Sequence, residues 1–332
     1  MLVSSRADCR GLLSLVAMSG EHVHPAVTRI VREHDGRELL DALSSELSTS
    51  DLTALMLEVM HRRTANLAAA RVLDQYERDR FVRPAGVDPR RLLALELLAL
   101  DTLVPPFVPI ATSPLVPLGT HSVVAGVHQN RIVTTTRGSE VAADPTNTLA
   151  LEAAVRRRAL LREDARSNVV VDLVAVDRVV RAQQFKGPRS SAHFSLLGLA
   201  SAGRDTGNHT FEATSMQHQI QACIAVCHAN GHRHLDVRIS DFSGQHQALI
   251  GALIEAMHTD AVRITSWPER TAARGYYPSL CFKLCVLDNN EEVEIGDGGL
   301  VDWTRALVGS NKERLMISGL SLERLAALTP TQ

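Results

Sequence analysis

The sequence has few aromatic residues and no excess of charge of either sign. Aromatic residues make up 4% of the 332 residues, and 35 Lys and Arg residues oppose 37 Asp and Glu residues. Base-stacking surfaces combine aromatic rings with basic side chains, and electrostatic binding to a phosphate backbone needs a basic field. The composition therefore argues against an extended nucleic-acid-binding surface, although it is compatible with a local basic patch.

Long apolar runs and a convincing export signal are also missing. A transmembrane helix needs about 20 consecutive apolar residues, and no segment approaches that length. The short apolar run at 11–18 lacks a cleavage site, so we interpret it as a helix. The five cysteines are then expected to be reduced thiols. We expect a cytoplasmic protein with no membrane partner.

Nucleotide-binding glycine motifs are absent, since the sequence contains neither GxGxxG nor GxxxxGK[ST]. Residues 27–83 have the apolar spacing of helices, and the segment RPAGVDP that follows is a break. Beyond it, helices and hairpins follow one another without a regular βαβ alternation. The pattern predicts an α+β fold, with a helical N-terminal extension at 1–87 before a core at 88–332.

The expected core begins with a helix, because Asp88 and Pro89 suit its N-cap and first position. The segment SVVAGVHQNRIVTTT is rich in β-branched residues and predicts two strands that turn at 129–130. A helix is expected at 145–158, strands on both sides of the loop at 184–192, and a hairpin that turns at 289–290. Together these elements predict an antiparallel sheet flanked by helices.

A basic hairpin loop is the first candidate site. Arg181 ends one expected strand, Lys186 and Arg189 lie in the loop, and His193 and Phe194 open the return strand. Guanidinium groups match phosphate in charge and in bidentate geometry, so this cluster suits a polyphosphate. The alternative is an ordinary solvated basic loop.

Two further segments carry candidate binding residues. Tyr276 and Tyr277 follow Arg274-Gly275 and open an apolar strand, which suits a pocket wall or simple strand packing. Near the C-terminus, SGLSLERL places Arg324 one helical turn after a small-residue turn. A phosphate between Arg324 and Arg181 would use both cations; otherwise Arg324 is a surface residue of a helix.

These segments, in their order and wording, resemble the catalytic core of class II aminoacyl-tRNA synthetases, in its histidyl-tRNA synthetase-like branch. DRVVRAQQFKGPRSSAHF is similar to motif 2 and ISGLSLERL to motif 3. The substrate segment of this branch is similar to RGYYPSLCFKL, and the glycine-rich turn that follows it is similar to IGDGGLVDW. The strand and helix that carry an acidic-x-Thr pair in this branch are similar to VTTTRGSEVAADPTNTLALEAAVRR. The resemblance covers about residues 88–325. It implies a six- or seven-stranded antiparallel sheet and a homodimer.

The resemblance implies that ATP and Mg²⁺ are the cofactors. Arg181 would hold the α-phosphate and Arg324 the γ-phosphate, and both would stabilise charge during adenylation. Gln183, Arg189 and Phe194 would complete the ATP site. Gln183 stands where this motif has an acidic residue.

The resemblance also assigns substrate contacts. Asp144 and Thr146 match the acidic-x-Thr pair that holds a substrate amino group, and Tyr276 and Tyr277 match the side-chain pocket. Arg274 matches the arginine that holds the substrate carboxylate, although its spacing to Tyr276 is two residues short and Arg270 competes for the role.

We therefore expect a class II synthetase-like ligase that forms an acyl-adenylate from ATP and an amino acid or a similar small-molecule carboxylate. Too few residues follow motif 3 for an anticodon-binding domain, so we do not expect ordinary tRNA charging. The alternative is a non-catalytic regulatory subunit of ATP phosphoribosyltransferase in histidine biosynthesis, which would need a protein partner. A decayed synthetase-like scaffold is a third reading. The identity of the substrate and the role of 1–87 stay open.

No metal site of the protein's own is predicted. The segment CIAVCHANGHRH invites a zinc interpretation, but its spacing is not that of a common zinc finger, and a core helix ended by a glycine is favoured. Cysteines four apart on one strand share a face, so core thiols are also favoured at 281 and 285 over a cysteine nucleophile.

Overall fold

The computed structural model describes residues 25–33, 36–183, 191–288 and 291–328. The chain divides into two compact units, Met1–Leu67 and Ala68–Gln332. The division that we predict at residue 87, from the start of the synthetase-like core, stays a prediction. Helix α5 (Ala69–Arg78) and helix α6 (Pro89–Leu103) both belong to the second unit.

The described part of the first unit is helical, as its apolar spacing predicts. It contains α2 (Pro25–Glu33), α3 (Gly36–Asp41), the π-helical turn η1 (Ala42–Glu46) and α4 (Thr49–Thr64). Helix α4 begins where the hydroxyl of Ser48 accepts a hydrogen bond from the backbone N–H of Asp51 at 3.1 Å. No residue of α2 or α4 is buried, so neither helix contributes a core of its own.

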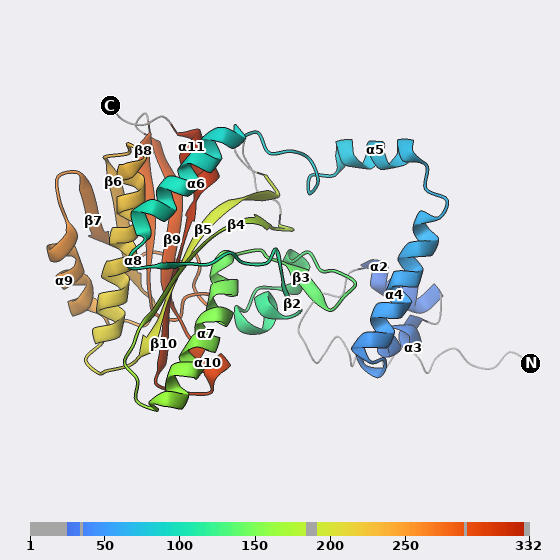
Figure 1. The fold of residues 1–332 in the computed structure, drawn as a ribbon, viewed down its shortest axis with the longest axis horizontal. Coiled ribbons are helices and arrows are strands. Elements are labelled where there is room, and N and C mark those ends of the chain that lie inside the picture. Colours follow the sequence, from blue (N-terminus) through green and yellow to red (C-terminus); the bar gives the residue numbers. More distant parts are fainter. Residues whose placement is uncertain (1–24, 34–35, 184–190, 289–290, 329–332) are drawn as a thin grey trace, which may run out of the picture. The chain divides into compact units, whose positions relative to one another are not determined.

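An eight-stranded sheet forms the centre of the second unit (Figure 1). Its six central strands are antiparallel, whereas each edge strand runs parallel to its neighbour. The α+β class is thus confirmed, but the sheet is wider than the expected six or seven strands and is mixed at its edges. In spatial order the strands are β1 (Val108–Pro109), β4 (Val171–Val180), β5 (His193–Arg204), β10 (Glu313–Ser321), β9 (Glu291–Val301), β8 (Leu280–Asp288), β6 (Leu235–Asp241) and β7 (Val262–Ser266).

Helices cover both faces of this sheet (Figure 1). One core joins the sheet to α6, α8 (Thr210–Ala229), α9 (Gln247–Met257) and α11 (Leu322–Ala327). The other joins it to α7 (Pro145–Glu163), with Trp303 of α10 (Trp303–Val308). Strand residues alternate between the two: Leu173 and Ala175 face α7, and Val174 faces the opposite core. No described helix is both long and apolar enough to cross a membrane.

The predicted strand pair at 122–136 is wrong. The segment instead contains the turn η2 (Thr120–Val124) and the short 3₁₀ helix η3 (Gln129–Arg131), beside a small sheet of β2 (Leu115–Pro117) and β3 (Ser139–Val141). The buried carboxylate of Glu140 explains the difference, because it accepts hydrogen bonds from the backbone N–H groups of Gly119 (3.3 Å) and His121 (2.8 Å). A carboxylate that satisfies a turn outweighs a β-branched composition.

A buried ion pair holds α7 against β10. Nε and Nη2 of Arg157 lie 2.7 and 2.9 Å from the two carboxylate oxygens of Glu313, and both side chains are fully buried. Two further guanidinium N–H groups donate to the backbone oxygens of Val169 and Ser167. This bidentate geometry satisfies the charges that folding removes from water.

We predict that Arg157→Met lowers the free energy of unfolding by about 3–5 kcal/mol, because it leaves the Glu313 carboxylate buried and unpaired. Urea-induced unfolding followed by circular dichroism measures the loss. The double variant Arg157→Met/Glu313→Leu is the control and should regain most of the stability, since it removes both charges. A loss below about 1 kcal/mol in the single variant, as for a surface pair, would contradict the prediction.

Candidate functional site

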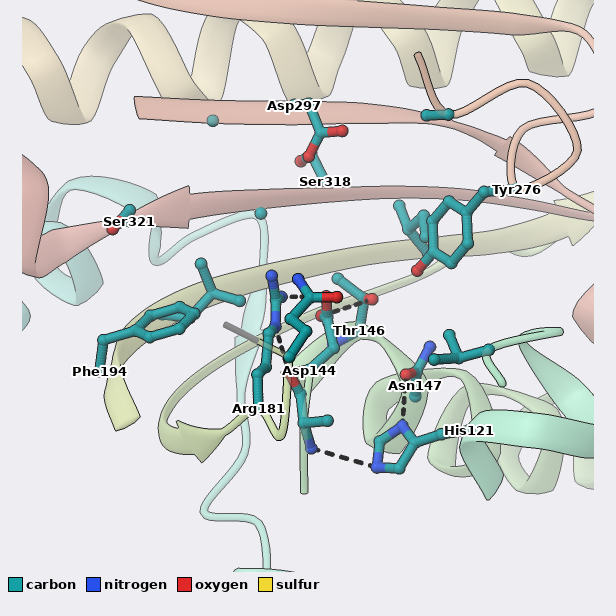
Figure 2. Close-up of a pocket in the computed structure, with 18 of the residues that line it drawn as sticks. His121, Asp144, Thr146, Asn147, Arg181, Phe194, Tyr276, Asp297, Ser318 and Ser321 are labelled. Carbon is teal, nitrogen blue, oxygen red and sulfur yellow. Dashed lines mark hydrogen bonds and ion pairs between the residues drawn. The ribbon is translucent and has the colours of Figure 1, made fainter. Parts of the chain in front are cut away.

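A cavity of about 450 Å³ opens on the α7 face of the sheet, between the N-terminus of α7, the strands β5, β9 and β10, and the loop before β8 (Figure 2). Its wall combines apolar side chains with several cations and several carboxylates. The charged residues that line it are Arg131, Asp144, Arg181, Glu294, Asp297, Glu323 and Arg324.

The N-terminus of α7 provides one wall of the cavity. Asp144 caps the helix: its Oδ1 accepts hydrogen bonds from the backbone N–H of Thr146 at 3.0 Å and from its hydroxyl at 2.7 Å. Pro145 lies directly over Gly198 of β5, where a Cβ atom would come within 2.7 Å of the proline ring. The absence of a side chain at Gly198 therefore lets the cap lie against the sheet.

Arg181 follows β4 and points into the same cavity (Figure 2). Its Nε donates to the backbone oxygen of Ala143 at 2.9 Å, and its Nη2 lies 3.0 Å from Oδ2 of Asp144. The guanidinium also lies over the ring of Phe194, 5.1 Å from the ring centroid. Arg181, at the end of β4, thus contacts both the N-terminus of α7 and the start of β5.

Tyr276 and Tyr277 form the inner wall, and their rings meet edge to face at 4.9 Å. The hydroxyl of Tyr277 donates to Oδ2 of Asp297 at 3.3 Å, and Nη2 of Arg270 lies 3.5 Å from the same oxygen. Burial raises the pKa of both tyrosines, and it raises the pKa of Asp297 to about 6, although Arg270 opposes that shift. The Asp297 side chain is still 40% exposed, toward the cavity.

A β-bulge in β9 places Asp297 in the cavity. Leu284 pairs with Gly296 and Cys285 with Glu294, so Ile295 is an extra residue between them. Ile295 packs in the core opposite α7, whereas Val301, beyond the bulge, packs on the α7 side. The bulge therefore moves the odd-numbered residues after it from one face of the sheet to the other.

A hydrogen-bond chain fixes the side chain of Asn147 behind Tyr276 (Figure 2). The backbone N–H of Ala143 donates to Nε2 of His121 at 3.1 Å, so Nε2 is an acceptor and the ring proton is on Nδ1. Nδ1 then donates to Oδ1 of Asn147 at 2.7 Å. The Nδ2 amide group of Asn147 remains buried without a hydrogen-bond partner among the described residues.

Arg324 lies at another part of the cavity wall. It is exposed, in the first turn of α11, and its Nη1 donates to the backbone oxygen of Glu294 at 3.0 Å. That carbonyl precedes the extra residue of the bulge. The neighbouring carboxylates are engaged as well: Glu294 pairs with Lys283 at 3.0 Å and Glu323 with Arg178 at 2.9 Å.

Most residues of the predicted site line this one cavity: Asp144, Thr146, Arg181, Gln183, Phe194, Tyr276, Tyr277 and Arg324. Arg189, with the rest of 184–190, lies outside the described residues. Arg274 is the exception: it is exposed and lies over the ring of Phe242 at 4.8 Å. Arg274 is not among the residues that line the cavity, and its assignment to the substrate carboxylate stays a prediction. Arg270 does not line the cavity either, but it is buried next to Asp297, which does.

Sequence reasoning missed His121, Asn147 and Asp297. A signal existed for Asn147, which directly follows the acidic-x-Thr pair on the same helical turn. Asp297 is the one charged residue between Gly296 and the pair Gly298–Gly299. His121 gave no signal, because its neighbourhood reads as a strand.

The cysteine-rich segments lie in the core. Cys223 and Cys227 of α8 are buried, whereas His228 and His234 are exposed, and Sγ of Cys223 lies 3.9 Å from Oγ of Ser318. Cys281 and Cys285 of β8 are buried as well. Burial raises the pKa of all four thiols, which lowers their reactivity. Within the described ranges, no three His, Cys, Asp or Glu side chains are placed to hold a metal ion.

The raised pKa of Asp297 predicts a pH-dependent stability. The folded chain binds the Asp297 proton more tightly than the unfolded chain, so the contribution of Asp297 to stability falls as pH rises from its usual value of 3.8 to about 6. The variant Asp297→Asn resembles the protonated form and lacks this fall. Urea unfolding at pH 4.5 and pH 7 should show the variant gaining stability relative to the unmodified protein. An equal difference at both pH values would contradict the shift.

Comparison with known proteins finds similarity in structure. No protein-family model and no curated protein sequence matches the chain. The fold is similar to an ATP phosphoribosyltransferase regulatory subunit/histidyl-tRNA synthetase from Bacillus halodurans C, with a TM-score of 0.51, 13% identity, and coverage of 74% of this chain and 82% of that chain. A histidine–tRNA ligase subunit from Alicyclobacillus acidocaldarius has a TM-score of 0.53 and 15% identity, with coverage of 74% and 96%.

The apo histidyl-tRNA synthetase of S. aureus has the same TM-score of 0.53 and 15% identity, with coverage of 74% of this chain and 69% of that chain. At these identities the similarity concerns the fold. The second unit therefore has the fold of the class II aminoacyl-tRNA synthetase catalytic core, in its histidyl-tRNA synthetase-like form.

Proposed function

We propose that the cavity binds ATP and an amino acid, or a similar carboxylate, and that the chain joins them as an acyl-adenylate. One observation carries the proposal: Arg181, Arg324 and the Asp144–Thr146 pair come from distant parts of the sequence and line the same cavity. Two cations suit the phosphates, and an anion with a hydroxyl suits an ammonium group. These are the two charged ends of the reaction partners.

Arg181 is suited to the α-phosphate. Its contacts to Ala143 and Asp144 occupy two of its five N–H groups, so three remain for phosphate oxygens. The contact to Asp144 also holds the cation next to the expected ammonium site, where a substrate carboxylate would approach the phosphorus. Phe194 offers a ring on the other side of Arg181. The arrangement orients both reactants around one fixed cation.

In the proposed reaction a carboxylate oxygen of the substrate attacks the α-phosphorus, and the bond to the bridging oxygen of pyrophosphate breaks. Negative charge develops on the leaving pyrophosphate, where Arg324 would stabilise it. Mg²⁺ bound with ATP would neutralise further phosphate charge. Glu294 and Glu323 are the cavity carboxylates beside Arg324, and both would exchange an existing ion pair to contact the ion.

A homodimer through α6 is part of the proposal. Leu93 and Leu97 project from this helix and are 64% and 61% exposed, whereas Leu92 and Leu95 are buried in the core. Two exposed leucines one turn apart are a small apolar face that a second copy would cover. We propose no tRNA partner for the reaction.

A second candidate function is amino-acid sensing without adenylation, as in a regulatory subunit that contacts a catalytic protein. Two observations favour it. Gln183 occupies the position of an acidic residue in the resembling motif, and Arg181 is already paired with Asp144. One of the similar structures is described as an ATP phosphoribosyltransferase regulatory subunit/histidyl-tRNA synthetase.

ATP–pyrophosphate exchange tests the ligase. With Mg²⁺ and each of the twenty amino acids in turn, one or a few should stimulate exchange. Arg181→Ala and Arg324→Ala should lower the rate by at least about 10²-fold, because each removes a cation from the phosphates. Arg305→Ala, an exposed arginine outside the cavity, is the matched control and should keep the full rate. Unchanged exchange in both cavity variants would overturn the assignment.

Calorimetry distinguishes the two candidates. Titration of the full chain with the same amino acids, without ATP, should show binding under either function. Asp144→Ala should weaken that binding by about tenfold or more, since it removes a charge-assisted contact to the ammonium group. Binding without any exchange would favour the sensor. No binding and no exchange would exclude both functions for this cavity.

A further inference from the structure

The carboxylate of Asp297 has one oxygen available inside the cavity. Both of its close contacts, to Tyr277 and to Arg270, use Oδ2 and are long, at 3.3 and 3.5 Å. Among the residues that the structure describes, none bonds Oδ1. Asp297 lines the cavity and keeps 40% of its side chain exposed there.

Glycines on the same face keep the space around this carboxylate open. Gly319 of β10 lies opposite Asp297, and a Cβ atom there would have no neighbour closer than 3.7 Å. Gly299 follows two residues later on the same face, and its missing Cβ admits the ring of Tyr277, which would otherwise lie 2.6 Å away. Tyr277 therefore reaches Asp297 from one side while the side facing Gly319 stays empty.

Arg270 favours the anionic form of Asp297 without covering its carboxylate, whereas Glu294 and Asp144 oppose that form. Arg270 is buried, and its Nε and Nη1 donate hydrogen bonds to the backbone oxygens of Ala272 and Phe282. Lys283, opposite Asp297 on β8, places its ammonium group on Glu294 at 3.0 Å. Asp144 adds a second negative charge that faces Asp297 across the cavity. A ligand carboxylate would therefore be repelled at this position.

A second polar group without a partner lies in the same wall. The Nδ2 amide group of Asn147 is buried next to the hydroxyl of Tyr276 but makes no hydrogen bond of normal geometry within the described part of the chain, and Oδ1 is fixed by His121. A buried polar group without a hydrogen bond is destabilising, so a ligand that pairs with it gains affinity. An apolar ligand side chain would leave both Asp297 and Asn147 unpaired, whereas a polar one would satisfy them.

We infer that Asp297 is a specificity-determining residue, which selects an amino acid whose side chain ends in an N–H group that donates to its carboxylate. The inference rests on the proposed function, because it takes the cavity to be an amino-acid site. It names the substrate class: side chains that end in an amide, an amine or a nitrogen heterocycle bearing N–H. Acidic and purely apolar side chains are excluded.

Calorimetric titration of the full chain at pH 7.5 with matched amino-acid pairs tests this class. The pairs are glutamine against glutamate, asparagine against aspartate, and lysine against norleucine, followed by histidine and arginine against leucine. At least one N–H-bearing member should bind, and it should bind about tenfold or more tightly than its partner without N–H, since a site built for a hydrogen bond rejects the analogue that lacks it.

Asp297→Asn supplies the second arm. The new amide presents its own N–H groups, so the preference for the N–H-bearing member should fall by at least tenfold, and the carboxylate partner should gain affinity. Glu292→Gln makes the same chemical change on the same strand outside the cavity, and should leave the preference unchanged. A general structural effect of Asp297→Asn would weaken both members equally.

The outcomes separate the inference from the proposed function. Binding of acidic or apolar amino acids only, or an unchanged preference in Asp297→Asn, would overturn the role of Asp297 and leave the cavity as an amino-acid site. Binding of no amino acid by the unmodified chain would overturn the proposed function, and the inference with it. Retained discrimination in the control, together with its loss in Asp297→Asn, supports both.

Discussion

The cavity depends on the buried ion pair between Arg157 and Glu313. It joins the middle of α7 to the start of β10, and both side chains are completely removed from solvent. The N-terminus of α7 carries Asp144 and Thr146, and the other end of β10 carries Ser318 and Gly319. This charged contact, together with the packing of α7 on the sheet, therefore fixes the separation of two walls of the cavity, and its bidentate geometry restricts sliding of the helix.

Charge inside the cavity is organised as neighbouring opposite pairs. Arg181 pairs with Asp144, and Arg270 approaches Asp297. Each pair orients its members in the absence of a ligand. A substrate with separated charges then exchanges one protein partner for one ligand partner at each end, so binding costs little reorganisation. This property suits a ligase and a sensor alike, and it explains why the static arrangement resembles both.

The sequence predicted the parts of the site that lie on regular elements. The strand end at Arg181 and the turn before Arg324 follow from local patterns, whereas Asp144 and Thr146 come from the resemblance, as does the expectation that these residues lie together. It failed where one buried side chain decides the conformation: Glu140 converts an expected strand pair into helical turns. Asp297 was missed because strict alternation places it on the same face as Val293 and Ile295, which pack in the opposite core.

The extra residue in β9 has a consequence for how this chain tolerates change. Up to the bulge, Val293 and Ile295 of β9 pack in the core against α8 and α9. Beyond it, the odd-numbered residues lie on the other face of the sheet, where Asp297 lines the cavity and Val301 packs on the α7 side. A substitution at an odd-numbered position after the bulge therefore changes the cavity face of β9, whereas a substitution at Val293 or Ile295 changes the core against α8 and α9. The same fold can acquire a new charge in its binding cavity without carrying that charge into its core.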